Sequence, residues 1–210
     1  MDDITTTVTW FAEPGPQNTA ATLAAALRRA RTLGLSHVVV ASDTGKTAKD
    51  VLAAFGPEFR VVVVTNAPNL ALPVAKLHDY LPRFADHKRA LAAAGTRKIP
   101  ASLSEAQVAE LRAMGAAVLR MDWSKITAFA HADFRSLERI GVAVRVAVCI
   151  TVTAHIDGAL PTGQDVLALA GTGFGGGGAD TALVMRPAAA WRDWRVLETI
   201  ARPRVGPPSE

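Results

Sequence analysis

The segment HVVVASDTGKTAKDVL, at residues 37–52, constrains the fold and the function of this 210-residue chain more than any other feature. Its first residues are mostly apolar and β-branched, which predicts a buried strand, and Val51, Leu52 and Phe55 fit the inner face of a following helix. Between strand and helix lies the polar loop of residues 42–47. Glycine, hydroxyl groups, a lysine and a helix N-terminus in one loop favour the binding of a phosphate.

The end of this loop resembles that of a P-loop. Gly45, Lys46 and Thr47 match the last positions of G-x-x-x-x-G-K-[ST], but residue 40, where the pattern requires Gly, is Val. We also find no later strand that ends in the Asp of a nucleoside triphosphatase. A smaller cup for a single phosphate fits better, and the alternative is an ordinary strand-to-helix turn that binds nothing.

The arrangement of apolar runs and turn residues predicts the fold. We expect strands at residues 8–11, 37–41, 60–65, 116–120, 165–170, 181–186 and 195–201, and helices at residues 19–34, 47–55, 86–94, 104–114 and 133–140. Strands that alternate with helices favour a three-layer α/β/α domain with a mostly parallel, doubly wound sheet and a C-terminal antiparallel hairpin. Residues 142–156 are ambiguous, because their Val, Ile and Thr content favours a strand whereas their length allows a buried helix.

A second loop, at residues 171–179, connects two apolar strands. Six of its first eight residues are glycine, more than a hairpin requires, so we expect the backbone to approach a ligand closely. A mobile hairpin tip is the alternative. Gly171, Gly173 and Gly176 match G-x-G-x-x-G, but a strand follows instead of the helix of a dinucleotide site.

Composition excludes several classes of partner. The net charge is +4 and the pI about 9.6, but Lys and Arg are dispersed without aromatic residues between them, so we expect no nucleic acid. The longest apolar stretch contains Arg145 and is too short for a bilayer, so we expect no membrane partner. One cysteine, Cys149, and scattered histidines predict no disulfide and no metal site. An N-terminus without signal-peptide features favours a cytoplasmic location, and homo-oligomers are left open.

Several motifs together carry a family resemblance. They are FAEPGPQNTAATL, VVVASDTGKTAKDV, RVVVVTN, DGALPTGQDVLALAGTG, GADTALVM and LETIARPR. The chain resembles the C-terminal α/β domain of pyruvate kinase, and more closely the small free-standing proteins built from that domain alone. The resemblance implies a helix at residues 142–156, and a segment near residues 70–100 is extra to the family pattern. The sequence shows no internal repeat and no linker, which predicts one domain over residues 1–210 with a polar tail at residues 203–210.

The resemblance also implies a site. In pyruvate kinase the first loop holds a phosphate of a sugar-bisphosphate activator, and the glycine-rich loop closes over that ligand. Thr65 and Asn66, at the end of a neighbouring strand, and Asp180, just after the glycine-rich loop, complete the set. The candidate ligand-binding residues are Ser42, Asp43, Thr44, Gly45, Lys46, Thr47, Thr65, Asn66, Gly171, Thr172, Gly173, Phe174, Gly175, Gly176, Gly177 and Asp180.

Flavin mononucleotide (FMN) and a sugar phosphate are the expected ligands, with Phe11, Trp123 and Phe174 as candidate neighbours of a flat ring. The sequence shows no Ser-His-Asp set and no close pair of carboxylates, which favours a ligand-binding module. Regulation is one function that such a module could have. The alternative is an uncharacterised enzyme that uses a flavin nucleotide or acts on a sugar phosphate. We expect no pyruvate kinase activity, since its catalytic barrel alone needs about 250 residues.

Overall fold

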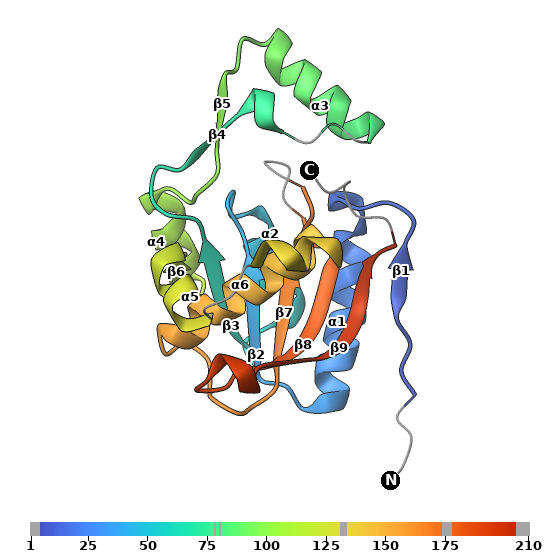
Figure 1. The fold of residues 1–210 in the computed structure, drawn as a ribbon, viewed down its shortest axis with the longest axis vertical. Coiled ribbons are helices and arrows are strands. Elements are labelled where there is room, and N and C mark those ends of the chain that lie inside the picture. The colour runs from blue at the N-terminus through green and yellow to red at the C-terminus, as the bar shows by residue number, and fades with distance from the viewer. Residues whose placement is uncertain (1–4, 78, 80, 131–133, 174–177, 205–210) are drawn as a thin grey trace.

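The computed structural model describes residues 5–77, 79, 81–130, 134–173 and 178–204. At its centre is a seven-stranded sheet in the order β1-β9-β8-β7-β2-β3-β6 (Figure 1). The strands are β1 (Thr9–Phe11), β2 (His37–Ala41), β3 (Arg60–Thr65), β6 (Ala117–Arg120), β7 (Val166–Ala170), β8 (Thr181–Arg186) and β9 (Arg195–Pro203). Within the described residues, β8 alone runs antiparallel to its neighbours, so the other strands of this sheet all end at the same edge.

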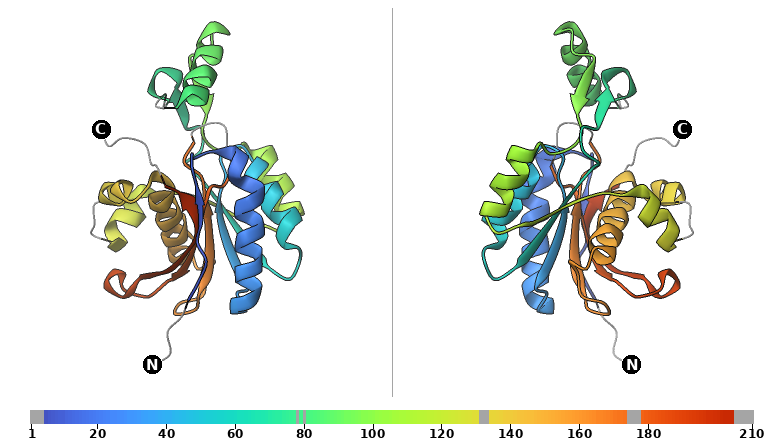
Figure 2. Two further views of the ribbon diagram at one scale, coloured as in Figure 1. Left: turned by 90° about the vertical axis from the view of Figure 1, so that its right-hand side faces the viewer. Right: turned by 90° about the vertical axis from the view of Figure 1, so that its left-hand side faces the viewer.

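Helices cover both faces of the sheet (Figure 2). One face carries α1 (Thr19–Leu33), α2 (Lys46–Phe55) and α4 (Glu105–Ala113), and the other carries α5 (Trp123–Ala130) and α6 (Val142–Ile156). Side chains alternate along each strand, so Val38 and Val40 pack with the first group of helices and Val39 with the second. The predicted three-layer α/β/α fold with a C-terminal antiparallel hairpin, β8–β9, is confirmed.

The ambiguous segment is the helix α6, although many of its residues are β-branched. Most of its side chains are buried against the sheet and its neighbours, and this burial outweighs the intrinsic preference for a strand. The hydroxyls of Thr151 and Thr153 donate to the carbonyl oxygens of Ala147 and Cys149, at 2.7 and 2.9 Å, so both of these buried hydroxyls are hydrogen-bonded within the helix. In the described part of the chain, no helix combines the length and apolarity needed to cross a membrane.

Several element boundaries differ from the expected ones. The helix expected at residues 86–94 is α3 (Pro82–Ala93), which begins with a proline in its first turn. The expected helix at residues 133–140 is a 3₁₀ helix, η3 (Phe134–Arg139). Helix α5 was missed, and its signal is Asp122, which accepts the backbone N–H of Ser124 at 2.9 Å.

The extra segment leaves the sheet as an arm, defined here as residues 70–100 (Figure 1). Its stem is the antiparallel pair β4 (Ala71–Pro73) and β5 (Lys98–Pro100), and it carries the 3₁₀ helix η2 (Val74–Lys76) and α3. A small apolar cluster of its own contains Leu72, Val74, Leu77, Leu91 and Ile99. The arm stands beyond the edge at which the parallel strands end, and this places it over the two predicted loops (Figures 1 and 2).

Candidate functional site

The two loops meet at the carboxyl edge of the sheet. The first loop, residues 42–47, leads from β2 into α2 and includes the first two residues of that helix, and the glycine loop, residues 171–179, lies between β7 and β8. Because β2 and β7 are parallel neighbours, both loops leave the sheet at the same edge. The backbone N–H of Gly178 donates to Thr47 Oγ1 at 2.9 Å, across 131 positions of sequence. The structure therefore places the two loops together, as the sequence predicts.

A cavity of about 210 Å³ opens between these loops and α6. Its lining residues are Ala41, Ser42, Asp43, Thr44, Thr47, Val64, Thr65, Asn66, Leu70, Leu72, Met121, Trp123, Val142, Arg145, Val146, Cys149, Ile150, Gly171, Thr172, Gly173 and Gly178. Polar groups from the ends of β2, β3 and β7 form one side. Apolar side chains from α6, the arm and the segment after β6 form the other.

The first loop presents hydroxyl and N–H groups to the cavity wall. Gly45 precedes the helix in a left-handed conformation with φ of 81°, which a side chain would strain. Ser42 Oγ accepts the N–H of Ala48 at 3.3 Å and keeps its own proton for another acceptor. Among the described residues, the N–H groups of Lys46 and Thr47 have no acceptor, as is normal for the first turn of a helix. An anion would satisfy these donors.

Two predicted residues of this loop do not line the cavity. Lys46 is exposed, and its ammonium group lies 2.8 Å from the carboxylate of Asp50, one helical turn away. Gly45 contributes its conformation but is not part of the lining. The positive charge expected from Lys46 is therefore directed along the surface of α2 and away from the site.

Asp43 joins the ends of β2 and β3. Its Oδ1 accepts from the Thr65 hydroxyl at 3.0 Å and from the Asn66 N–H at 3.2 Å, and its Oδ2 accepts from Asn66 Nδ2 at 3.0 Å. Burial raises the pKa of the Asp43 carboxyl above its ordinary value, although these hydrogen bonds act in the opposite direction. The three predicted residues are thus brought together at the cavity wall, with a carboxyl group in the centre.

Asp180 lies behind the glycine loop and holds it in place. Its Oδ2 accepts the N–H groups of Gly15 and Thr172 at 2.8 and 3.2 Å, and its Oδ1 accepts the hydroxyls of Thr172 and Thr181, both at 3.1 Å. Burial raises the pKa of this carboxyl as well. Asp180 is completely buried and does not line the cavity, so its role is to position the loop.

At Gly171 and Gly178 the absence of a side chain allows close packing within the protein, and not the expected close approach to a ligand. A Cβ added to Gly171 would lie 2.0 Å from the carbonyl oxygen of Gly178, and one added to Gly178 would lie 2.5 Å from the Cα of Pro16. Here the close approach is between segments of the protein's own backbone. A Cβ added to Gly173 would lie 3.8 Å from its nearest neighbour, Cε1 of Phe84, and the backbone there is open to the cavity. Phe174, Gly175, Gly176 and Gly177 lie outside the described residues.

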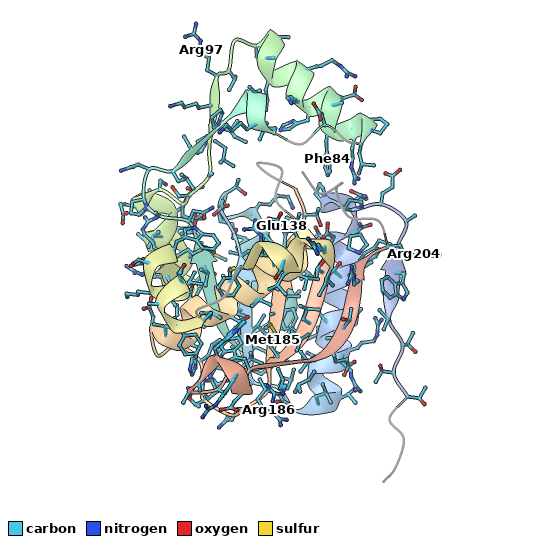
Figure 3. All side chains as sticks on the ribbon, viewed as in Figure 1. Phe84, Arg97, Glu138, Met185, Arg186 and Arg204 are labelled. Atoms are coloured by element: carbon cyan, nitrogen blue, oxygen red, sulfur yellow. The ribbon has the colours of Figure 1, made fainter. Side chains whose placement is uncertain are left out.

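Arg145 supplies a cation that the sequence analysis missed. Its mostly buried side chain lines the cavity, and its Nε lies 2.9 Å from Oε1 of Glu138, which Figure 3 labels. In the sequence it is a single charge within an apolar segment. The helical spacing of Val142, Arg145, Val146 and Cys149 would have placed it on the same face as the other lining residues.

The other side of the cavity is apolar. Leu70, Leu72, Met121 and Trp123 line it, and the Trp123 side chain is 45% exposed. Phe11 packs against the core on the α1 face and is not part of the lining, so only one described member of the predicted aromatic set lines the cavity.

The chemistry that these groups offer is recognition of an anion next to an apolar surface. Burial raises the pKa of the Cys149 thiol to about 12, so this cavity residue stays protonated and is a poor nucleophile. In the described part of the chain, no group of three or more His, Cys, Asp or Glu side chains could hold a metal ion.

Comparison with known proteins agrees with the topology. The family described as "Pyruvate kinase, alpha/beta domain" matches residues 20–185, which include both loops, β2, β3, β7 and α6. The match spans most of the 210-residue chain. The chain therefore belongs to the pyruvate kinase alpha/beta domain family.

Proposed function

We propose that the protein binds a small phosphorylated molecule in the cavity between the first loop and the glycine loop. The observation that carries this proposal is the convergence of anion donors on one cavity. Ser42 and Thr47 each accept a hydrogen bond within the protein, so each hydroxyl keeps its proton for a phosphate oxygen. The N-terminus of α2 adds its dipole, and Arg145 adds a formal charge from the opposite wall.

The carboxyl group of Asp43 is compatible with this proposal. An ionised carboxylate beside a phosphate is unfavourable, but three hydrogen bonds already satisfy this group, and burial raises its pKa. Its Oδ2 accepts only from Asn66 Nδ2 among the described residues, so it can still accept a ligand hydroxyl. This arrangement suits a phosphate joined to a hydroxyl-bearing chain.

The apolar side of the cavity favours FMN over a sugar phosphate. A flavin ring would bury apolar area against Leu70, Leu72 and Met121, and it could stack on the half-exposed ring of Trp123. The ribityl hydroxyls would lie beside Asp43 and the phosphate at the first loop. A sugar bisphosphate would leave this apolar surface without a matching partner.

A titration of FMN with the purified protein, followed by flavin fluorescence, tests the proposal. Riboflavin is the matched control, because it has the same ring and ribityl chain but no phosphate. A charged hydrogen-bonded group contributes about 1.5–3 kcal/mol, so FMN should bind about 10- to 150-fold more tightly than riboflavin. Equal affinity for the two flavins, or no binding of FMN, inorganic phosphate or a sugar bisphosphate, would contradict the proposal.

Asp43 also supports a second candidate function, an enzyme that uses the bound nucleotide or acts on a sugar phosphate. A carboxyl group with a raised pKa at a cavity wall is a candidate for proton exchange with a bound ligand. Asp43→Asn would then abolish turnover while the phosphorylated ligand still binds. Turnover that Asp43→Asn leaves unchanged would exclude this role for Asp43.

A further inference from the structure

We propose that the arm is the recognition element of the cavity, which attracts anionic ligands by its charge and retains them through its stem and its helix α3. The inference deepens the proposed function and rests on it. Three independent observations support it: the stem lines the cavity, α3 contacts the glycine loop and the segment between β1 and α1, and the arm holds the charge surplus of the chain.

The stem of the arm forms part of the apolar wall. Leu70 and Leu72 line the cavity, and Leu72 also packs against the apolar cluster of the arm. Leu70 is 39% exposed, an apolar side chain that a ligand would cover. A change in the position of the arm would therefore change the shape of the apolar wall.

Helix α3 lies against the glycine loop and against the segment between β1 and α1. In Figure 3 the side chain of Phe84 points from α3 toward the body of the domain, and its ring lies 3.8 Å from a Cβ built on Gly173. A Cβ on Gly15 would lie 2.6 Å from Nη2 of Arg83. No residue of α3 is fully buried, so its position depends on a small number of such contacts. These contacts are suited to holding the glycine loop over a ligand.

The arm carries an excess of positive charge. Its charged residues are the cations Lys76, Arg83, Lys88, Arg89, Arg97 and Lys98 and the anions Asp79 and Asp86. This surplus of four equals the formal net charge of +4 of the whole chain, so the remainder of the chain is balanced. Lys88 pairs with Asp79 and Arg89 with Asp86. Nε and Nη2 of Arg83 are buried without a hydrogen-bond partner among the described residues.

Such a distribution concentrates positive potential at one end of the molecule, above the cavity opening. A field of this kind raises the association rate of an anionic ligand, and salt screens the effect. The stem and α3 act after the encounter, because they contact the cavity and its loops, and they should affect dissociation. The two contributions can be measured separately.

The charge contribution is tested with two triple variants that lose the same number of charges. Lys76→Gln, Arg97→Gln and Lys98→Gln reduce the charge surplus of the arm from four to one, whereas Arg31→Gln, Arg60→Gln and Arg192→Gln remove three cations from the opposite end of the domain. In stopped-flow measurements with FMN, the arm variant should associate about tenfold more slowly at low ionic strength, with a weaker salt dependence. Its dissociation rate should be unchanged. Equal slowing in both variants, or none in the arm variant, would overturn this part.

The retention contribution is tested by shortening the arm. Leu72 and Ile99 face each other in the stem, so Asn-Gly in place of residues 73–98 joins them through a two-residue hairpin turn. Far-UV circular dichroism and thermal unfolding establish that the shortened protein folds. FMN should dissociate at least about tenfold faster from it, whereas inorganic phosphate, measured by ³¹P NMR, should bind more weakly only to the extent that the lost charge of the arm slows its association.

Point variants of the full-length chain provide a second test that does not depend on folding of the shortened one. Phe84→Ala and Arg83→Gln should accelerate FMN dissociation, and Arg89→Gln, on the same helix but paired with Asp86, should not. Wild-type dissociation rates in the shortened chain and in both α3 variants would overturn the arm proposal and leave the proposed function intact. A wild-type protein that binds neither FMN nor phosphate would overturn both.

Discussion

The backbone N–H of Gly178 donates to the hydroxyl oxygen of Thr47 at 2.9 Å, and this hydrogen bond fixes the glycine loop to the first turn of α2. Thr47 is buried, whereas Gly178 is partly exposed and lines the cavity. This hydrogen bond links the two walls of the site directly.

Thr47→Val should loosen this connection with little change in side-chain shape. A part-buried hydrogen bond contributes about 0.5–1.5 kcal/mol net, so we expect the free energy of unfolding in urea to fall by this amount. FMN binding should weaken in parallel. Thr32→Val is the control, because its exposed hydroxyl only donates to a carbonyl within α1, and its effect should be below about 0.5 kcal/mol. Equal stabilities of the two variants would refute the role given to Thr47.

Arg145 and Lys46 should contribute very differently to ligand affinity. Arg145 lines the cavity, so Arg145→Gln should weaken FMN about 10- to 150-fold, as expected for a lost charged hydrogen bond, and leave riboflavin binding almost unchanged. Lys46 pairs with Asp50 on the surface, so Lys46→Gln should change affinity less than about threefold. Fluorescence titrations of both variants with both flavins test this. A larger loss for Lys46→Gln would mean that its side chain turns toward the ligand.

Gly171 and Gly173 should tolerate alanine to different extents. The Cβ of Ala at residue 171 would meet the carbonyl oxygen of Gly178 at 2.0 Å, so the loop must move, at a cost of about 1–3 kcal/mol. At residue 173 the closest atom would be at 3.8 Å, an ordinary contact. Thermal and urea unfolding should therefore distinguish Gly171→Ala, which destabilises, from Gly173→Ala, which does not. Similar losses in both would contradict the loop geometry.

Asp180 should give the stability of the fold a particular pH dependence. Burial raises its pKa in the folded state above the ordinary value of 3.8, so its contribution is fully present below that pH and is lost as the pH rises through the raised pKa. Asp180→Asn removes the titrating group and disturbs the hydrogen bonds to Gly15 and Thr172. The variant should be less stable at every pH, by a gap that narrows as the pH rises above 3.8. A gap that widens in urea unfolding would contradict this.

His155 should give the stability of the fold the opposite dependence on pH, with a loss that begins as the pH falls below 6.5. Its ring lies 5.9 Å from that of Phe129 and 5.8 Å from that of Trp194, and burial lowers its pKa below 6.5. The contribution of neutral His155 is present above pH 6.5 and is lost as the pH falls through the lowered pKa. His155→Phe should therefore reduce the fall in melting temperature on acidification. His87→Phe, at an exposed residue of the arm, should retain that fall, and the same result for both variants would count against His155.

The sequence predicts the sheet and both loops because their signals are local and strong. The short β-branched runs before Ser42 and before Asn66 favour buried strands, and parallel strands bring the loops that follow them to one edge. Ser104 is likewise found at a complete capping box with Gln107. These features need no knowledge of distant contacts.

The parts that sequence analysis missed depend on tertiary contacts. The Lys46 side chain points toward Asp50, one helical turn later, and pairs with it. The sequence pattern does not show whether Lys46 pairs with Asp50 or points into the cavity. Arg145 became visible as a site residue only once the structure placed one face of α6 at the cavity beside the two loops. The requirement for glycine at residue 171 comes from Gly178, on the return of the same loop.

The position of β2 in the sheet has a consequence for synthesis of the protein on the ribosome. One neighbour, β3, follows β2 closely in the chain, but the other, β7, is synthesised much later. Until then the edge of β2 that includes Val38 and Val40 has no partner strand. All side chains of β7 are buried in the finished fold. A nascent chain that ends before residue 166 therefore exposes a long apolar strand edge, and this stage is where chaperones would be needed most and where aggregation would begin.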